Sequence, residues 1–177
     1  MRPQLHIIFV GKHNNIRSVF AEAILHQKIG RAGLMKQFTC SSAGTDALTQ
    51  APPPKDIQVF MRKHGYDISG KISHMVTKQM IESADIVFGL DRTVHDYLQK
   101  KYKLQKGKIF LLRQFDLPDP TNDPDIRDIS ENHDAADILE TYGNVKREIN
   151  RIFEKLSLIS NKKVAMAKEY NKRKLEA

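Results

Sequence analysis

The apolar residues of this chain form short continuous runs that alternate with stretches of helical spacing. Runs of this length, bounded by polar residues, predict strands buried on both faces of a sheet, at 7–10, 37–41, 85–90 and 108–112. Apolar residues three and four positions apart predict helices at 17–29, 57–64, 77–84 and 135–158, and around 94–98. The alternation predicts an α/β fold, a single domain with a four-stranded parallel sheet and helices on both faces in a Rossmann-like arrangement.

The length and charge of the chain refine this picture. A chain of 177 residues suits one domain, which we place at 1–158, followed by a basic C-terminal tail at 159–177. The net charge is +8, and residues 161–177 carry six Lys or Arg against two Glu. We interpret the tail as a solvated helix, and we expect neither nucleic acid nor a membrane as its partner.

The number of cysteines and the lengths of the apolar runs indicate the cellular compartment of the protein. A single cysteine, Cys40, excludes an internal disulfide and favours a reducing environment. The sequence has no apolar run long enough to cross a membrane, and its first residues lack the apolar core of a signal peptide. We therefore expect a cytoplasmic protein, and the sequence leaves its oligomeric state open.

The loop between the first predicted strand and the first helix carries the clearest chemistry. A strand, a tight loop and a helix direct backbone N–H groups and the positive end of a helix dipole at one point. Arg17 adds a guanidinium that can form paired hydrogen bonds with an oxyanion. We therefore predict that phosphate or another oxyanion binds this loop, which consists of Gly11, Lys12, His13, Asn14, Asn15, Ile16, Arg17 and Ser18.

This loop resembles that of the low-molecular-weight protein tyrosine phosphatases and the related arsenate reductases, which read V-C-x-G-N-x-C-R-S followed by A-E. The residues in register are Val10, Asn14, Arg17, Ser18, Ala21 and Glu22. Three positions differ: Gly11 replaces the first cysteine, His13 the loop glycine, and Ile16 the second cysteine. Further matches follow in the family's order, at Ser42-Ala43-Gly44-Thr45, Leu90-Asp91 and Asp119-Pro120, so the resemblance covers about residues 5–158.

The resemblance implies roles for several residues. Arg17 would bind the phosphate, and Asp119 would be the general acid that protonates the leaving group. Ser42 and Asp91 would support the loop. The family's bracing segment is altered here, since Lys71, Ser73 and His74 stand in its place, and Thr121-Asn122 replace the aromatic residues that line the family's substrate cleft. We expect no cofactor and no metal.

Gly11 determines what chemistry remains. In the family a cysteine thiolate attacks phosphorus, whereas glycine has no side chain with which to attack. Cys40 is predicted on the second strand, and nothing in the sequence places it in the loop. Our first hypothesis is a pseudophosphatase, which binds phosphate or a phosphorylated protein without turning it over. Two alternatives stay open: a weakly active phosphatase in which water or His13 attacks, and a scaffold protein whose partner binds the basic tail.

Two other features receive structural interpretations. His13 is bulkier than the family's glycine, and we expect it to strain the loop or narrow the pocket. The acidic segment 121–134 has aspartates spaced as in some calcium loops, but it lacks the glycine at the sixth position and the closing glutamate. We therefore predict a solvated loop there.

Overall fold

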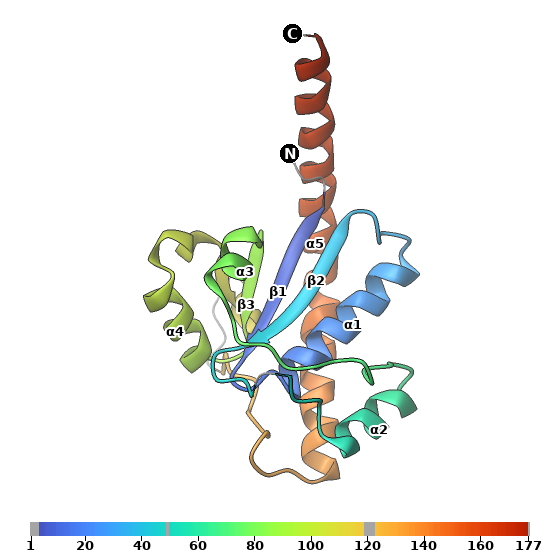
Figure 1. The fold of residues 1–177 in the computed structure, drawn as a ribbon. Helices are drawn as coiled ribbons and strands as arrows, with labels where there is room; N and C mark the ends of the chain where they lie inside the picture. The colour runs from blue at the N-terminus through green and yellow to red at the C-terminus, as the bar shows by residue number, and fades with distance from the viewer. Residues whose placement is uncertain (1–3, 49, 119–122, 177) are drawn as a thin grey trace.

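The structure, a computed structural model, describes residues 4–48, 50–118 and 123–176, with side chains described as far as Arg173. Its centre is a four-stranded parallel sheet with the strand order β2-β1-β3-β4 (Figure 1). The strands are β1 (Leu5–Gly11), β2 (Phe38–Gly44), β3 (Ile86–Gly89) and β4 (Ile109–Leu111). The predicted fold class is confirmed, and the strands lie within two residues of their predicted bounds, apart from the longer reach of β2 at its carboxyl end.

Helices cover both faces of this sheet. On one face lie α1 (Arg17–Arg31) and the long α5 (Ala135–Glu176), with α2 (Lys55–Lys63) packed beside them. On the other face lie α3 (Lys78–Ser83) and α4 (Arg92–Lys101). Two short 3-10 helices, η1 (Lys103–Lys108) and η2 (Leu112–Gln114), flank β4. Strand–helix alternation places the carboxyl ends of all four strands at one edge of the sheet, the lower edge in Figure 1.

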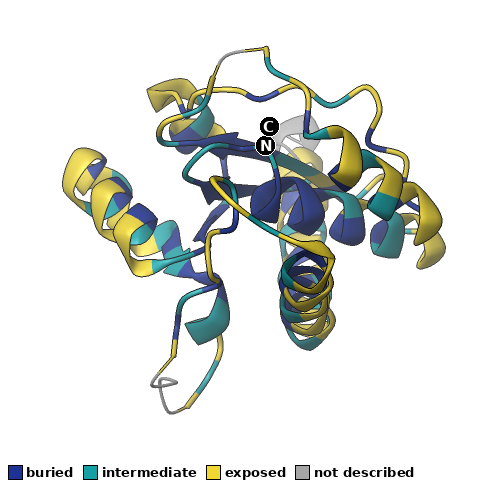
Figure 2. Ribbon diagram, turned by 90° about the horizontal axis from the view of Figure 1, so that it is seen from below, coloured by how far each residue is buried: buried dark blue, intermediate teal, exposed yellow. Residues whose placement is uncertain are grey.

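Strand β1 contributes side chains to two apolar clusters, one on each face of the sheet. Successive side chains of a strand point to opposite faces. Ile7 and Phe9 accordingly pack against α1 and α5, whereas Ile8 and Val10 pack against α3 and α4. Figure 2 shows the result: most of the sheet is buried, and each surrounding helix has a buried side and an exposed side. Burial on both faces explains why β1 is almost continuously apolar in sequence.

Side-chain caps fix the start of both helices on the second face. The hydroxyl Oγ1 of Thr77 accepts a hydrogen bond from the Met80 N–H at 3.2 Å and begins α3. The carboxylate Oδ1 of Asp91 accepts one from the Val94 N–H at 2.8 Å and begins α4. Such caps satisfy N–H groups that have no partner within the helix. Asp91 is thereby held rigidly at the carboxyl end of β3.

Helix α5 continues without a break past position 158 and projects beyond the sheet (Figure 1). Its first turns after that position still contact the domain: Ser160 Oγ donates to the Gln37 carbonyl at 3.2 Å, and Lys163 pairs with Asp85 at 2.5 Å. The helical form of the tail is thus confirmed, while the division at 158 stays a prediction.

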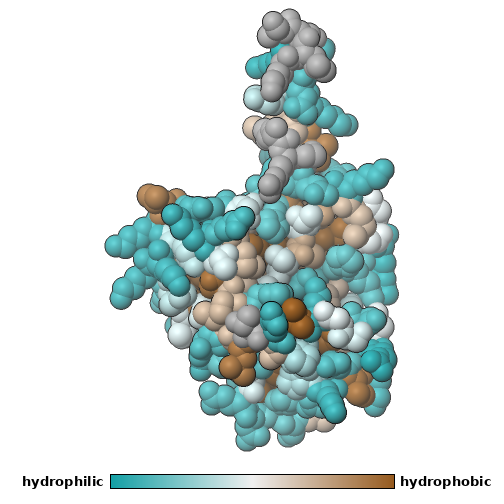
Figure 3. All heavy atoms as spheres, viewed as in Figure 1, coloured by the Kyte–Doolittle hydropathy of each residue, from teal (hydrophilic) through white to brown (hydrophobic). Residues whose placement is uncertain are grey.

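Hydrophilic side chains cover most of the face seen in Figure 3, with apolar side chains in small groups. In the part of the chain that the structure describes, no helix is both long enough and apolar enough to span a bilayer.

Candidate functional site

The loop 11–18 leaves the sheet at the carboxyl end of β1, and Asn14 fixes its curvature. This residue has a φ of 56°, in the left-handed region that asparagine tolerates better than most residues. Its buried side-chain amide donates from Nδ2 to the hydroxyls of Ser18 at 3.0 Å and Ser42 at 2.9 Å. Its Oδ1 accepts a hydrogen bond from the His74 N–H at 2.9 Å. Asn14 therefore joins the loop to α1, β2 and the segment before α3.

A chain of polar contacts extends this support outward. The Ser42 hydroxyl donates to Glu22 Oε2 at 2.7 Å, and Lys71 forms an ion pair with the other oxygen of Glu22. Glu22, on α1, is mostly buried, and its charge is matched by Lys71. Ser42 thus lies where the resemblance expects loop support, and Lys71 reaches the same network from the altered bracing segment.

Gly44 allows the loop to lie against β2. A Cβ at this position would be 2.5 Å from the Lys12 carbonyl oxygen and 3.0 Å from the Asn14 nitrogen, both closer than van der Waals contact. Any other residue would push the loop away from the strand. The Ser-Ala-Gly-Thr motif therefore has two physical reasons: its serine bonds Asn14, and its glycine admits the backbone of the loop.

His13 does not carry the strained backbone of the loop, since the positive φ falls on Asn14. Its ring nitrogen Nδ1 lies 2.9 Å from the carbonyl oxygen of Asp46, and the Asp46 N–H donates to the Lys12 carbonyl at 2.8 Å. The histidine thus adds a contact between this loop and the one that follows β2. The φ of His13 therefore shows no backbone strain, and the expectation that its bulk narrows the pocket stays a prediction.

Gly11 ends β1 at the point where the resemblance places a cysteine. A Cβ here would lie 3.5 Å from Ser18 Oγ and 3.7 Å from Ser18 Cβ, which are ordinary contact distances. Gly11 also lies outside the left-handed region, so its backbone suits any residue. The surroundings therefore admit a side chain that would point towards the Ser18 hydroxyl.

Cys40, the only cysteine of the chain, lies on β2 and not in the loop. Burial, together with the negative charge of Glu22, raises the pKa of its thiol to about 12, despite the opposing effect of Lys71. A thiol with such a pKa is almost entirely protonated near neutral pH and is a poor nucleophile.

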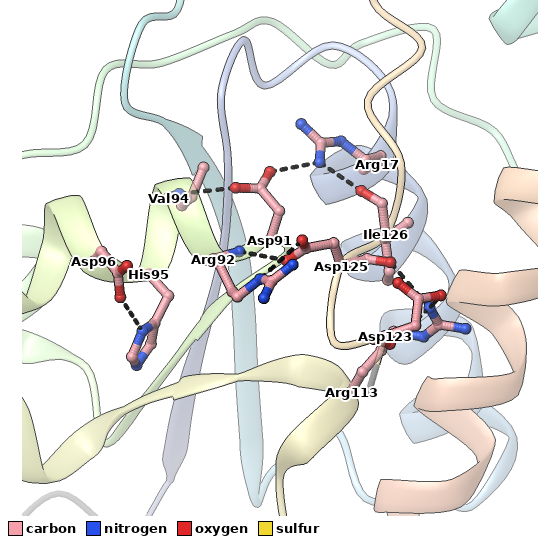
Figure 4. Close-up of polar contacts among 10 residues, drawn as sticks. All are labelled: Arg17, Asp91, Arg92, Val94, His95, Asp96, Arg113, Asp123, Asp125 and Ile126. Carbon is pink, nitrogen blue, oxygen red and sulfur yellow. Dashed lines mark hydrogen bonds and ion pairs between the residues drawn. The ribbon is translucent and has the colours of Figure 1, made fainter. Parts of the chain in front are cut away.

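Arg17 is the buried cation of the site, with 3% of its side chain exposed. Its Nη1 donates to Asp91 Oδ2 at 2.6 Å and to the Ile126 carbonyl at 2.7 Å (Figure 4). Its Nη2 pairs with Asp128 Oδ2 at 2.6 Å. The structure therefore brings Asp91 to the loop, as the resemblance expected. It also brings Ile126 and Asp128, which sequence reasoning missed.

Ile126 and Asp128 belong to the segment 123–134, which we call the acidic strap. The prediction of a solvated loop is wrong for its apolar positions, because Ile126 and Ile129 are each 1% exposed in the core. The Ile126 N–H also donates to the Leu90 carbonyl at 2.9 Å. Two isoleucines three positions apart among aspartates were the signal that could have revealed this anchoring.

Arginine–aspartate pairs attach the first part of the acidic strap to α4 and η2. Figure 4 shows Arg92 reaching Asp125, with Nε 3.1 Å from Oδ2, and Arg113 reaching Asp123, with Nη1 2.7 Å from Oδ2. Asp119, the expected general acid, lies outside the described residues, as do Pro120 and Thr121-Asn122. Its role therefore stays a prediction.

The last part of the acidic strap is attached by a pH-dependent contact. His133 Nε2 lies 2.9 Å from Asp56 Oδ2 on α2, and His133 Nδ1 lies 2.8 Å from the Ile129 carbonyl. Partial burial lowers the pKa of His133, but the hydrogen bonds to Asp56 and Ile129 outweigh it, and the net pKa is raised. The pKa of Asp56 is lowered, because the bonds to His133 and to its own helix outweigh its desolvation.

These shifts predict how His133→Gln changes stability with pH. A raised histidine pKa stabilises the fold below the unfolded pKa of about 6.5, and this contribution is lost as pH rises through the folded pKa. The lowered pKa of Asp56 preserves the pair down to about pH 4. Urea unfolding should show wild type more stable than the variant at pH 5.5, by less than about 1 kcal/mol because the Asp56 side chain is 56% exposed. The difference in unfolding free energy should shrink by pH 8.5. A difference independent of pH would contradict the raised pKa of His133.

A cavity of about 740 Å³ opens beside the loop. Arg17 and Lys12 border it from the loop, Val94 and Tyr97 from α4, and the acidic strap forms much of the remaining wall. Five carboxylates line it together with three cationic side chains, namely Asp46, Asp91, Asp125, Asp128 and Glu131 with Lys12, Arg17 and Arg127. Among the residues that the structure describes, no three His, Cys, Asp or Glu side chains group closely enough to hold a metal ion.

The site has a tight loop at a strand end, a buried arginine and an adjoining cavity, and comparison with known proteins agrees with that arrangement. Residues 6–175 match the family model of the low molecular weight phosphotyrosine protein phosphatases. The chain belongs to this family. The predicted resemblance is thereby confirmed.

Individual members of the family are distant in sequence. A probable low molecular weight protein-tyrosine-phosphatase, EpsP of Ralstonia nicotianae, is 29% identical over 117 residues, which are 64% of this chain and 77% of that protein. The low molecular weight phosphotyrosine protein phosphatase of Saccharomyces cerevisiae is 27% identical over 150 residues, 82% of this chain and 89% of its own. The crystal structure of a YwlE mutant from Bacillus subtilis superposes with a TM-score of 0.78 at 20% identity, covering 87% of this chain and 99% of that one. This last similarity supports the shared fold.

Proposed function

We propose that this protein is a pseudophosphatase that binds phosphate, or the phosphate group of a phosphorylated protein, in the loop 11–18 without hydrolysing it. The observation that carries the proposal is the combination of an intact loop with Gly11 at the end of β1. Asn14 and Arg17 are held by buried hydrogen bonds, while the position from which a thiolate would attack has no side chain.

Two features support oxyanion binding. Ile16 is the N-cap residue of α1, and its hydrocarbon side chain cannot accept hydrogen bonds from the first turn. The N–H groups of that turn and the positive end of the helix dipole therefore suit an anion. Arg17 lies in the same turn, and its planar guanidinium can form two parallel hydrogen bonds with one phosphate.

Two features count against turnover by the mechanism that the resemblance implies. That mechanism needs a thiolate next to phosphorus, and Gly11 supplies none. The remaining thiol, Cys40, lies on β2 with its pKa raised to about 12. Arg17 and the loop could still stabilise a transition state electrostatically. Without a cysteine, however, the transition state for thiolate attack on phosphorus does not form.

The cavity beside the loop suits the rest of a ligand. A phosphate in the loop would leave the attached group facing Val94, Tyr97 and the acidic strap. A volume of about 740 Å³ exceeds that of a phosphate ion and accommodates a phosphorylated side chain. We therefore favour a phosphorylated macromolecule over free phosphate as the ligand.

Isothermal titration with inorganic phosphate, paired with a p-nitrophenyl phosphate assay, tests the proposal. We expect saturable binding and no hydrolysis above the rate without protein. Arg17→Lys keeps the charge but loses the planar fork, and should weaken binding at least about tenfold. Arg31→Lys, at the opposite end of α1, is the matched control and should bind as wild type does. Hydrolysis that Arg17→Lys abolishes would overturn the proposal, as would the absence of phosphate binding.

A further inference from the structure

Asp128 of the acidic strap places a carboxylate inside the loop. Its Oδ2 is 2.6 Å from Nη2 of Arg17. Within the described part of the chain, the concave side of the loop is lined by residues 11–18 and Asp128, and it leaves no volume for a water-sized sphere. A carboxylate is the protein group closest in charge and hydrogen bonding to a phosphate oxygen pair. The site of the proposed ligand therefore already has an anionic occupant from the same chain.

We propose that Asp128 is a built-in competitor, whose carboxylate occupies the oxyanion site and must move out before a phosphate group binds. This inference rests on the proposed function, since it assumes that the loop binds oxyanions. The inference adds that phosphate binding is coupled to displacement of Asp128. The form in which Asp128 is paired with Arg17 therefore has low affinity for phosphate. The apparent dissociation constant then equals the intrinsic one divided by the fraction of molecules in which Asp128 is displaced.

The acidic strap is built to hold this carboxylate without fixing it permanently. Ile126 and Ile129 bury the backbone on either side of Asp128, and the Ile126 carbonyl accepts from Arg17. The Asp128 side chain itself is 31% exposed and lies at the edge of the cavity. A rotation of this one side chain therefore opens the loop while the buried anchors remain in place.

Charge balance shows why both anions cannot occupy the loop. The single positive charge of Arg17 already faces the carboxylates of Asp91 and Asp128, each at 2.6 Å. A phosphate added to these two would bring a third anionic group to one guanidinium, in a site where water screens poorly. Lys12 offers little compensation, because its side chain is 44% exposed and water screens its charge. Displacement of Asp128 removes one negative charge as the phosphate arrives.

Titration of Asp128→Asn and Asp128→Ala with inorganic phosphate tests the inference. Both variants should bind phosphate about tenfold more tightly than wild type, as expected if Asp128 is displaced in roughly one molecule in ten. Equal gains in phosphate affinity in the two variants would show that the lost negative charge, and not the new amide of asparagine, causes the tighter binding. In Asp128→Ala, acetate should compete with phosphate by refilling the vacated carboxylate position, whereas it should compete only weakly in wild type.

Glu131→Gln is the matched control, because it removes the same charge three residues further along the acidic strap. Its carboxylate is exposed and does not line the concave side of the loop, so phosphate affinity should change less than about twofold. Equal tightening by Glu131→Gln would overturn the inference in favour of general electrostatics. Unchanged affinity in both Asp128 variants, with wild type still binding, would overturn it and leave the proposed function intact. Failure of every protein to bind phosphate would overturn both.

Discussion

Gly11→Cys is expected to hydrolyse p-nitrophenyl phosphate at least about 100-fold faster than the rate without protein, a rate that wild type should not exceed. That is a small part of the roughly 10⁶-fold that a nucleophile contributes in a well-formed hydrolase site. The new Cβ would meet Ser18 Oγ at 3.5 Å, an ordinary contact distance, so it fits without displacing the loop. Arg17 and the N-terminus of α1 would lower the pKa of the thiol and favour the reactive thiolate.

Two companion variants show whether such a gain comes from the nucleophile. Gly11→Ser adds a side chain of similar size without a thiolate, and should remain as inactive as wild type. The double variant Gly11→Cys with Asp128→Asn should exceed Gly11→Cys alone, because phosphate would no longer compete with a carboxylate. A folded Gly11→Cys protein without activity would mean that replacements elsewhere, at His13 or Ile16, have removed more than the nucleophile.

Asn14→Ala is expected to lower the free energy of unfolding by about 3 kcal/mol. The side chain makes three hydrogen bonds, two buried ones to Ser18 and Ser42 and a partly buried one with the His74 N–H, and their loss leaves polar groups without partners. Alanine would also be strained at a φ of 56°. Urea unfolding monitored by circular dichroism measures the change, provided that the m-value is unaltered. Phosphate binding should be lost together with the loop geometry.

Asn14→Gly separates the two causes. Glycine adopts a positive φ without strain but makes no side-chain hydrogen bonds, so this variant should lose about 2 kcal/mol rather than 3. Asn15→Ala, at the next position in the same loop, should change stability by less than about 1 kcal/mol. If Asn14→Ala and Asn15→Ala were equally stable, Asn14 would not be the residue that fixes the loop.

The fold could be predicted from sequence because its signals are local. The apolar run of β1 requires burial on both faces, and the capping residues Thr77 and Asp91 mark where α3 and α4 begin. A parallel sheet then brings the strand ends together at one edge. The loop 11–18, Ser42 and Asp91 were therefore expected near one another, and the structure brings them there.

The contacts of Arg17 could not be predicted in the same way. Asp128 is 111 positions away in the chain and belongs to a segment whose aspartates suggest only solvent exposure. The buried isoleucines that position it, Ile126 and Ile129, form no complete helical or strand pattern. Lys71 was noticed as a departure from the family's bracing segment. Its partner Glu22 becomes apparent only once α1 and that segment are adjacent.

A crystal structure with tungstate, an oxyanion similar to phosphate with strong scattering, tests oxyanion binding most directly. We predict tungsten on the concave side of loop 11–18, with its oxygens within hydrogen-bond distance of Arg17 and the Asp128 carboxylate turned away. The opposite result would be a loop without tungstate at saturating concentration, with Arg17 still paired to Asp128. That result would contradict the view that this loop is an oxyanion site.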